Sequence, residues 1–228
     1  MQELISLDQQ LLLWFNGSDS LFIDSMAMTL TSKWTWIPLY LSLFYLVLKN
    51  NESMRQILLI IGCAALCVVM AGTVDDMIVK PLVARPRPTH DLQIGMLVDV
   101  VNEYRGGRYG FFSAHAANTF SVAIFFSLVV RHRILTIFMV TWSLVNCWTR
   151  MYLGVHYPGD ILCGLIWGAI VGTTVYAIYM RFSPNYQTMS RFISSAYTRR
   201  GYLIADIDKV LMVFSATLLY AILRACWQ

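Results

Sequence analysis

Long apolar stretches without charged residues recur along the chain and predict its main elements. Six such stretches stand out: residues 57–74, 161–180, 34–48, 116–130, 134–149 and 210–223. A helix needs roughly 17 to 25 residues to cross a bilayer, and polar or snorkelling flanks extend the shorter stretches toward that length. The pattern therefore predicts an all-α fold, namely a polytopic membrane helical bundle of about six transmembrane helices.

The opening stretch, residues 1–31, follows a different pattern. Polar residues, including Asp8, Asn16 and Asp24, interrupt its apolar positions. This favours an interfacial N-terminal segment of two short amphipathic helices over a spanning helix. The segment is unlike a cleaved signal peptide, because it lacks a basic start and carries Glu3 and Asp8 before its apolar stretch.

Nothing in the sequence marks a second domain, so residues 1–228 are predicted to form a single membrane domain. The longest irregular stretch is the loop 81–112, which contains repeated Pro and Gly residues. Loops of this length are uncommon in compact domains unless they are functional. Within it, the pattern of residues 92–104 predicts a short amphipathic helix on the membrane surface. A second polar linker covers residues 183–201.

Charge placement predicts the orientation. Only 13% of the residues are charged, and the net charge is +4. Many cations flank three connections that alternating spans place on one side: Lys49, Arg55, Arg131, Arg133, Arg181, Arg191, Arg199 and Arg200. By the positive-inside rule that side is cytoplasmic. The linker 183–201 is then cytoplasmic and the loop 81–112 extracytoplasmic.

Three polar clusters border the predicted spans, where polar residues are costly and mark function. They are residues 80–88 at the end of the second span, residues 112–115 at the start of the third, and residues 149–160 between the fourth and fifth. Because the spans alternate in direction, all three clusters emerge on the same face. We therefore expect them to form one site.

The residue types in these clusters suit phosphate chemistry. Lys80, Arg87 and Arg150 supply cations, and guanidinium groups match phosphate oxygens with forked donors. Ser113 opens the third span, where its hydroxyl and the following amides form an anion site at a helix N-terminus. Two further side chains, His115 and His156, add acid, base and nucleophile chemistry.

A neutral imidazole can attack phosphorus and split hydrolysis into two easier steps. His156 is the stronger nucleophile candidate, because Asp160 lies four residues later and is placed to hold its other ring nitrogen. His115 would protonate the leaving oxygen and later activate water. This chemistry requires no metal and no other cofactor.

The clusters resemble the signature of the type 2 phosphatidic acid phosphatase (PAP2) family, in its bacterial membrane lipid phosphatase branch. That signature reads Lys, six residues, Arg-Pro; then Pro-Ser-Gly-His; then Ser-Arg, five residues, His, three residues, Asp. Lys80 and Arg87 match the first part in full, and Arg150, His156 and Asp160 match the third at the same spacing.

The resemblance implies a role for each matching residue. His156 is then the nucleophile, His115 the acid and Asp160 the partner of His156. The implied phosphate-binding residues are Lys80, Arg87, Ser113, Ala114 and Arg150. The sequence departs from the signature at Phe112 for Pro, Ala114 for Gly and Thr149 for Ser. Ala114 matters most, because Gly lets the backbone approach the phosphate closely, yet a helix start needs no unusual dihedral and activity should survive.

Several charged neighbours have more than one interpretation. The six-residue interval selects Arg87, so Arg85 is expected to be a headgroup contact or a bystander. Asp75 and Asp76 lie about one turn before Lys80, and one of them is expected to pair with it.

Two cations of the long loop leave a choice open. Arg105 and Arg108 belong either to a solvated or headgroup-facing loop or to a lid that contacts a second phosphate or polar headgroup of the substrate.

The leading hypothesis is a metal-independent lipid phosphatase in the cell inner membrane, with its site facing the periplasm or exterior. Candidate substrates by resemblance are undecaprenyl diphosphate, lipid A, phosphatidylglycerol phosphate and phosphatidic acid. The alternatives are a non-catalytic lipid-binding or transport protein on the same scaffold and vanadate haloperoxidase-like activity. The expected partners are the lipid phosphate and the bilayer, with no nucleic acid and no obligatory protein partner. The five cysteines fall in or near the spans and indicate neither a disulfide framework nor a metal site.

Overall fold

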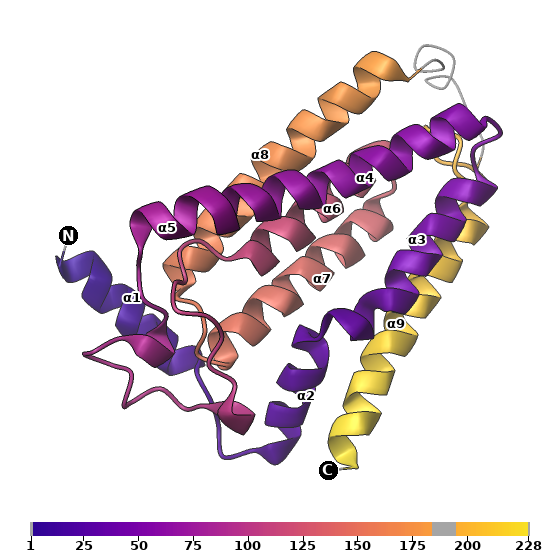
Figure 1. Ribbon diagram of the computed structural model, residues 1–228. Helices are drawn as coiled ribbons and strands as arrows, with labels where there is room; N and C mark the ends of the chain where they lie inside the picture. The colour runs from indigo at the N-terminus through magenta and orange to yellow at the C-terminus, as the bar shows by residue number, and fades with distance from the viewer. Residues whose placement is uncertain (1, 184–194, 228) are drawn as a thin grey trace.

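Six helices lie side by side at the positions that the apolar stretches predict (Figure 1). The computed structural model describes residues 2–183 and 195–227. The six helices are α3 (Ile37–Lys49), α4 (Met54–Val74), α6 (Ala114–Val130), α7 (Arg133–Tyr152), α8 (Pro158–Phe182) and α9 (Ile204–Cys226). The described part of the chain contains two isolated β-bridges and no strand. The prediction of an all-α bundle is confirmed.

The helices have the length and surface of a membrane protein. Three helical stretches are long and apolar enough to cross a bilayer, namely Met54–Val83, Pro158–Phe182 and Ile204–Cys226. In the first of them, α4 continues through the π-helix η2 (Asp75–Val79) into the single turn α5 (Lys80–Val83). Large apolar side chains point outward, among them Leu58 and Met212, with 63% and 70% of their surface exposed. Such a surface suits contact with lipid, as the predicted membrane bundle requires.

A stripe of glycines brings α8 against α6. Gly164, Gly168 and Gly172 recur every four residues on one face of α8. A Cβ atom at these positions would lie 2.7, 2.6 and 2.6 Å from carbonyl oxygens of Ser113 and α6, closer than real Cβ contacts allow. Small residues permit this kind of close helix packing in membranes. The stripe therefore sets the distance between the two helices that begin at the polar clusters.

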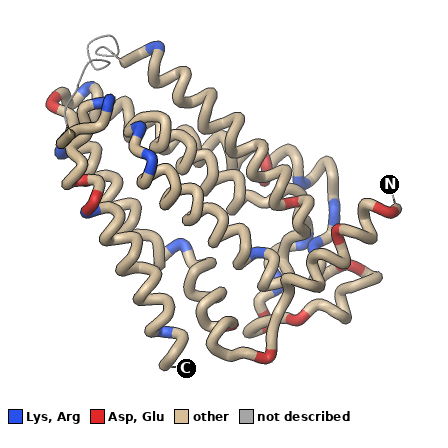
Figure 2. The backbone as a smooth tube through the Cα atoms, turned by 180° about the vertical axis from the view of Figure 1, so that it is seen from behind, with Lys and Arg blue, Asp and Glu red and all other residues tan. Residues whose placement is uncertain are grey.

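The ends of the bundle differ in charge. Lys and Arg residues gather around the turns from α3 to α4 and from α6 to α7 (Figure 2), flanked by Lys49, Arg55, Arg131 and Arg133. The opposite end carries the three polar clusters, because α5 ends there, α6 begins there and α7 passes into α8 there (Figure 1). Residues 184–194 of the predicted linker 183–201 lie outside the described residues.

The N-terminal segment contains the two short helices that the sequence predicts, α1 (Gln2–Phe15) and α2 (Leu21–Thr31). The residue between them, Asn16, fastens the segment to the end of the bundle that carries the clusters. Its Nδ2 donates to the carbonyl of Tyr152 at 2.8 Å, and its Oδ1 accepts the Asp99 N–H at 2.7 Å. The segment thus contacts both the end of α7 and the long loop.

The long loop corrects one expectation. The helix predicted over residues 92–104 is absent, and turns followed by the short 3-10 helix Val101–Glu103 replace it. Asn102 adopts a left-handed conformation with φ 47°, which cannot continue a right-handed helix. The amphipathic pattern still has a structural basis, because Ile94 and Val98 are buried against Leu12 and Tyr157.

Candidate active site

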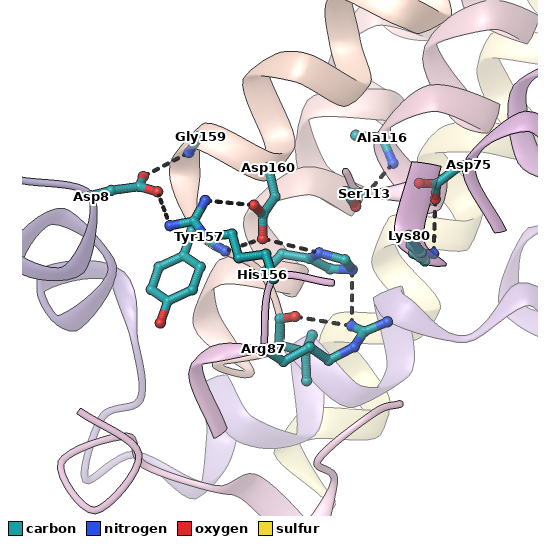
Figure 3. A network of polar contacts seen from close by, with 12 residues as sticks. Asp8, Asp75, Lys80, Arg87, Ser113, Ala116, His156, Tyr157, Gly159 and Asp160 are labelled. Carbon is teal, nitrogen blue, oxygen red and sulfur yellow. Dashed lines mark hydrogen bonds and ion pairs between the residues drawn. The ribbon is translucent and has the colours of Figure 1, made fainter. Parts of the chain in front are cut away.

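The three predicted clusters meet at one end of the bundle (Figure 3). His156, in the turn between α7 and α8, is almost completely buried. Burial holds its pKa well below the ordinary histidine value, and the neighbouring cations Arg87, Arg150 and Lys80 lower it further. Cations from three separate segments therefore surround one neutral imidazole.

The contacts of His156 indicate which ring nitrogen carries a lone pair toward the site. Nη1 of Arg87 lies 3.0 Å from His156 Nε2 and also donates to the Val155 carbonyl at 2.9 Å. A guanidinium can only donate, so Nε2 accepts and the proton of the neutral ring sits on Nδ1. Nδ1 faces Asp160 Oδ2 at 3.6 Å, too far for a hydrogen bond, and has no such partner among the described residues (Figure 3).

Asp160 is fully buried, and both its oxygens have other partners. Oδ2 accepts the backbone N–H of Tyr157 at 3.1 Å, which caps the start of α8. Oδ1 accepts from Arg85 Nη1 at 2.8 Å. The Asp160 carbonyl also accepts the Ser113 N–H at 3.1 Å, which joins the start of α8 to the start of α6.

Arg85 corrects a second expectation, because it is not a bystander but is held between two carboxylates. Its Nη1 donates to Asp160, and its Nη2 donates to Asp8 of α1 at 2.6 Å. Its guanidinium lies over the Tyr157 ring, 4.0 Å from the centroid. Sequence reasoning missed both Arg85 and Asp8, since no local spacing links residues so far apart in the chain.

Lys80 pairs with the acidic residues before it, as expected. Its Nζ lies 2.8 Å from Asp75 Oδ2 and 2.5 Å from Asp76 Oδ1. Asp75 is fully buried and belongs to the π-helix η2, whereas Asp76 is exposed. A π-turn often marks a functional position in a helix, and here it brings two carboxylates to one ammonium group.

Arg150, at the end of α7, has only 2% of its surface exposed. Its Nη1 donates to Thr31 Oγ1 at 2.7 Å, and its Nη2 donates to the Tyr104 hydroxyl at 3.1 Å. These partners are neutral, so they orient the guanidinium without cancelling its charge. Burial and the charge of Arg150 lower the pKa of Arg87 from its ordinary value. The two positive charges disfavour each other, and a bound anion would relieve this repulsion.

Ser113 and the residues after it form the start of α6. Ser113 is the N-cap, and its hydroxyl accepts the Ala116 N–H at 3.5 Å (Figure 3). Ala114 begins the helix and is not among the residues with positive φ, so Ala in place of Gly causes no strain there. His115 lines a cavity of about 300 Å³ together with Thr31 and Asn118. Thr31 links this cavity to Arg150.

Arg105 and Arg108 are exposed and belong to a segment that runs beside the site. The Arg87 N–H donates to the Arg108 carbonyl at 3.1 Å, and the Gly110 N–H donates to the Arg85 carbonyl at 2.9 Å. Arg108 also lines a surface cavity of about 920 Å³ with Arg85 and His90. The structure thus brings the backbone of this segment to the site and leaves the two guanidinium groups at the surface.

The described residues contain no group of three or more His, Cys, Asp or Glu side chains placed to hold a metal ion. What they do contain is a cluster of buried cations around two histidines. The Nε atoms of Arg87 and Arg150 are buried without a partner among the described residues. Such a cluster suits a tetrahedral anion whose oxygens accept several charge-assisted hydrogen bonds.

Comparison with known proteins shows which family this chain belongs to. The sequence pattern of the PAP2 superfamily matches residues 53–184, which include every residue of the three clusters. The chain belongs to the PAP2 superfamily. The predicted resemblance is therefore confirmed.

Individual relatives indicate the branch of the superfamily. A lipid A 4'-phosphatase of Bacteroides thetaiotaomicron is 41% identical over 186 residues, 81% of this chain and 82% of the relative. A lipid A 4'-phosphatase of Porphyromonas gingivalis is 34% identical over 183 residues, 79% of this chain and 76% of the relative. A lipid A 1-phosphatase of Rhizobium etli is 27% identical over 141 residues, 60% of this chain and 59% of the relative. No solved structure matches the chain.

These findings establish the general activity of this PAP2 protein. It is a bacterial membrane lipid phosphatase, a hydrolase. The main function is therefore enzymatic, in contrast to the alternative of a non-catalytic lipid-binding or transport protein on the same scaffold.

Proposed function

We propose that this PAP2 protein removes a phosphate from lipid A through a phosphohistidine intermediate on His156. Two relatives that align with most of the chain are named as lipid A 4'-phosphatases, which supports this substrate and, within it, the 4' position. The observation that carries the mechanism is the contact of His156 Nε2 with Arg87 at 3.0 Å inside a buried cluster of cations.

In the first step, Nε2 of His156 attacks phosphorus, the P–N bond forms and the P–O bond to the lipid breaks. The Nδ1 proton faces Asp160, which stabilises the positive charge that develops on the ring. Arg87, Arg150 and Lys80 neutralise the charge on the equatorial oxygens. The phosphate anion bound among the cations favours the protonated form of His115, which then gives its proton to the leaving lipid oxygen.

In the second step, His115 takes a proton from water, and the resulting hydroxide attacks phosphorus. The P–N bond breaks, and inorganic phosphate leaves with the proton balance restored, because His115 has regained the proton that it gave to the lipid. Every transfer in this cycle uses a side chain of the chain itself, and we propose that the reaction is independent of metal.

The proposed location is the inner membrane, with the site on the periplasmic face. The cations around the α3–α4 and α6–α7 turns support this orientation through the positive-inside rule. In this orientation residues 1–228 form one membrane domain, the segment 1–31 lies in the outer interface, the loop 81–112 is extracytoplasmic and the linker 183–201 is cytoplasmic.

Arg105 and Arg108 are proposed to contact a second phosphate or another polar part of the lipid headgroup. Both side chains are exposed, and Arg108 lines the cavity of about 920 Å³, which supports this role. The Arg105→Ala, Arg108→Ala double variant should lose activity toward lipid A and keep it toward short-chain phosphatidic acid. A variant that keeps the parent's ratio of activity on the two substrates would refute the contact.

One experiment tests the proposed function. Protein purified in detergent is incubated with lipid A, undecaprenyl diphosphate, phosphatidylglycerol phosphate and phosphatidic acid in excess EDTA, and phosphate release is measured beside a His156→Ala control. We expect the highest kcat/KM for lipid A, no activity in the variant and a labelled phosphoenzyme in the parent protein only. Activity retained by His156→Ala, or lost with EDTA, would overturn the mechanism, and preference for another lipid would overturn the substrate.

A further inference from the structure

The N-terminal helix α1 reaches the residues that surround His156. Asp8 of this helix lies outside residues 53–184, which the family pattern matches, yet it makes two contacts there. Its Oδ1 accepts the Gly159 N–H at 2.7 Å, and its Oδ2 accepts from Arg85 Nη2 at 2.6 Å. Figure 3 shows the Asp8 carboxylate beside Gly159, with Asp160 and His156 next to them.

We propose that Asp8 and Arg85 are positioning residues for His156. The surface helix α1 then also contributes to the active site. This inference rests on the proposed role of His156 as nucleophile. Two routes lead from Asp8 to the reacting ring. One runs through Arg85 to Asp160 Oδ1, and the other runs through the backbone of Gly159 to the turn that carries His156.

The start of α8 explains why a carboxylate belongs at this place. Pro158 is the first residue of α8 and has no N–H, so Gly159 provides the first free amide of the helix. An anion at a helix N-terminus is stabilised by that amide and by the helix dipole. Gly159 also lets Asp8 approach, because a Cβ atom there would lie 3.0 Å from Asp8 Oδ2.

The charges explain why Arg85 needs Asp8. The guanidinium of Arg85 lies between two carboxylates, and each accepts from a different nitrogen of its fork. This divided hydrogen bonding holds Arg85 in one orientation over Tyr157, and it holds Asp160 with Oδ2 toward His156. When Asp8 is replaced by a neutral residue, Arg85 keeps Asp160 as a charged partner and loses the ion pair that restrains its second nitrogen.

The test compares Asp8→Asn with Asp19→Asn, which removes the same charge from an exposed position of the same N-terminal segment. Asp8→Asn should lower kcat about tenfold through misplacement of the nucleophile, while KM changes less than about twofold because the phosphate-binding cations remain. Asp8→Ala and Gly159→Ala should act in the same direction. The double variant should be no worse than Asp8→Ala, since the contact that Gly159→Ala disturbs is one of the two that Asp8→Ala removes. Asp19→Asn should match the parent protein.

The pH profile of kcat/KM distinguishes a positioning role of Asp8 from an effect on protein stability alone. The charged and titratable groups around His156 are Lys80, Arg85, Arg87, His115, Arg150 and Asp160. Neutralising Asp8 leaves the positive charge of Arg85 less compensated, which disfavours protonation of His156. The acid limb of kcat/KM should therefore move to lower pH in Asp8→Asn. A loss of folded protein would lower the measured kcat/KM by the same factor at every pH and would leave the acid limb at the same pH.

The outcomes of this test separate a failure of the positioning role from a failure of the proposed function. Activity retained by His156→Ala refutes the proposed nucleophile whatever the Asp8 variants do. If His156→Ala is inactive, and Asp8→Asn either behaves like Asp19→Asn or loses rate with an unmoved acid limb, the positioning role alone is overturned. A lower kcat together with a shifted limb supports it.

Discussion

At the scale of single residues, Arg87 has the most demanding geometry in the site. One of its nitrogens contacts both the Val155 carbonyl and His156 Nε2, and the side chain is more than nine-tenths buried. A lysine keeps the charge but presents one ammonium group in place of a planar fork. It cannot hold the imidazole and bind phosphate oxygens in the same plane.

Arg87→Lys should therefore lower kcat/KM about 100-fold, equivalent to about 2.7 kcal/mol of transition-state stabilisation. Steady-state kinetics on the best lipid substrate measure the effect. Arg133→Lys, at an exposed position at the opposite end of the bundle, provides the control and should lose less than about threefold on the same substrate. An Arg87→Lys enzyme within threefold of the parent would show that charge alone suffices at this position.

The pH dependence of the reaction follows from the burial of His156. Burial and three cations hold its pKa well below the ordinary value, so the nucleophilic neutral form persists into acid. The acid limb of the kcat/KM profile, which reports protonation of the His156 ring, should therefore lie below pH 6.5. An acid limb with its midpoint at or above pH 6.5 would contradict this interpretation of the site.

How much of the site was predictable differs from residue to residue. The roles proposed for Lys80, Arg87, Arg150 and His156 rest on spacing within short segments, and alternating spans were enough to bring those segments to one face. Arg85 was misjudged, because its partners Asp8 and Asp160 come from α1 and α8. Long-range ion pairs leave no periodic trace in a sequence, so a pattern could not reveal them.

At the scale of elements, uncharged apolar stretches were a reliable guide because the bilayer imposes length and composition on every span. The segment 92–104 lacks that constraint, and there a left-handed residue overrode an amphipathic pattern. The glycine stripe of α8 was visible as Gly164, Gly168 and Gly172. The packing role of the stripe became clear only in the structure, where α6 lies against it, because the same glycine spacing also occurs in helices that pack loosely.

The stripe makes a prediction about stability. Gly168→Ala places a Cβ atom 2.6 Å from the Ala117 carbonyl oxygen, which forces α6 and α8 apart and should cost about 1–3 kcal/mol. Gly62→Ala is the matched control, because its Cβ would meet no atom within 4 Å and Ala favours the helix. Thermal unfolding in detergent should show a lower midpoint for Gly168→Ala and an equal or higher one for Gly62→Ala. Equal midpoints for Gly168→Ala and the parent would show that the packing can relax.

At the scale of the whole molecule, the end of the bundle that carries the site is built from both the N-terminal segment and the core of six helices. Asp8 contacts the start of α8, whereas Asn16 and Thr31 contact Tyr152 and Arg150 at the end of α7. The match to the family pattern begins at residue 53. Residues before it therefore contact the candidate site, whose proposed reacting groups all lie within the match.

The orientation of this whole assembly in the membrane is testable by labelling. In a background in which Ala replaces all five cysteines, Gly107→Cys lies in the exposed loop beside the site and has no atom within 4 Å of its Cβ. Glu52→Cys lies in the exposed turn between α3 and α4, at the opposite end. A membrane-impermeant maleimide applied to intact spheroplasts should label Gly107→Cys and should reach Glu52→Cys only after lysis. The reverse pattern would place His156 on the cytoplasmic face, where the positive-inside rule would be violated and the substrate would have to be a lipid of the inner leaflet.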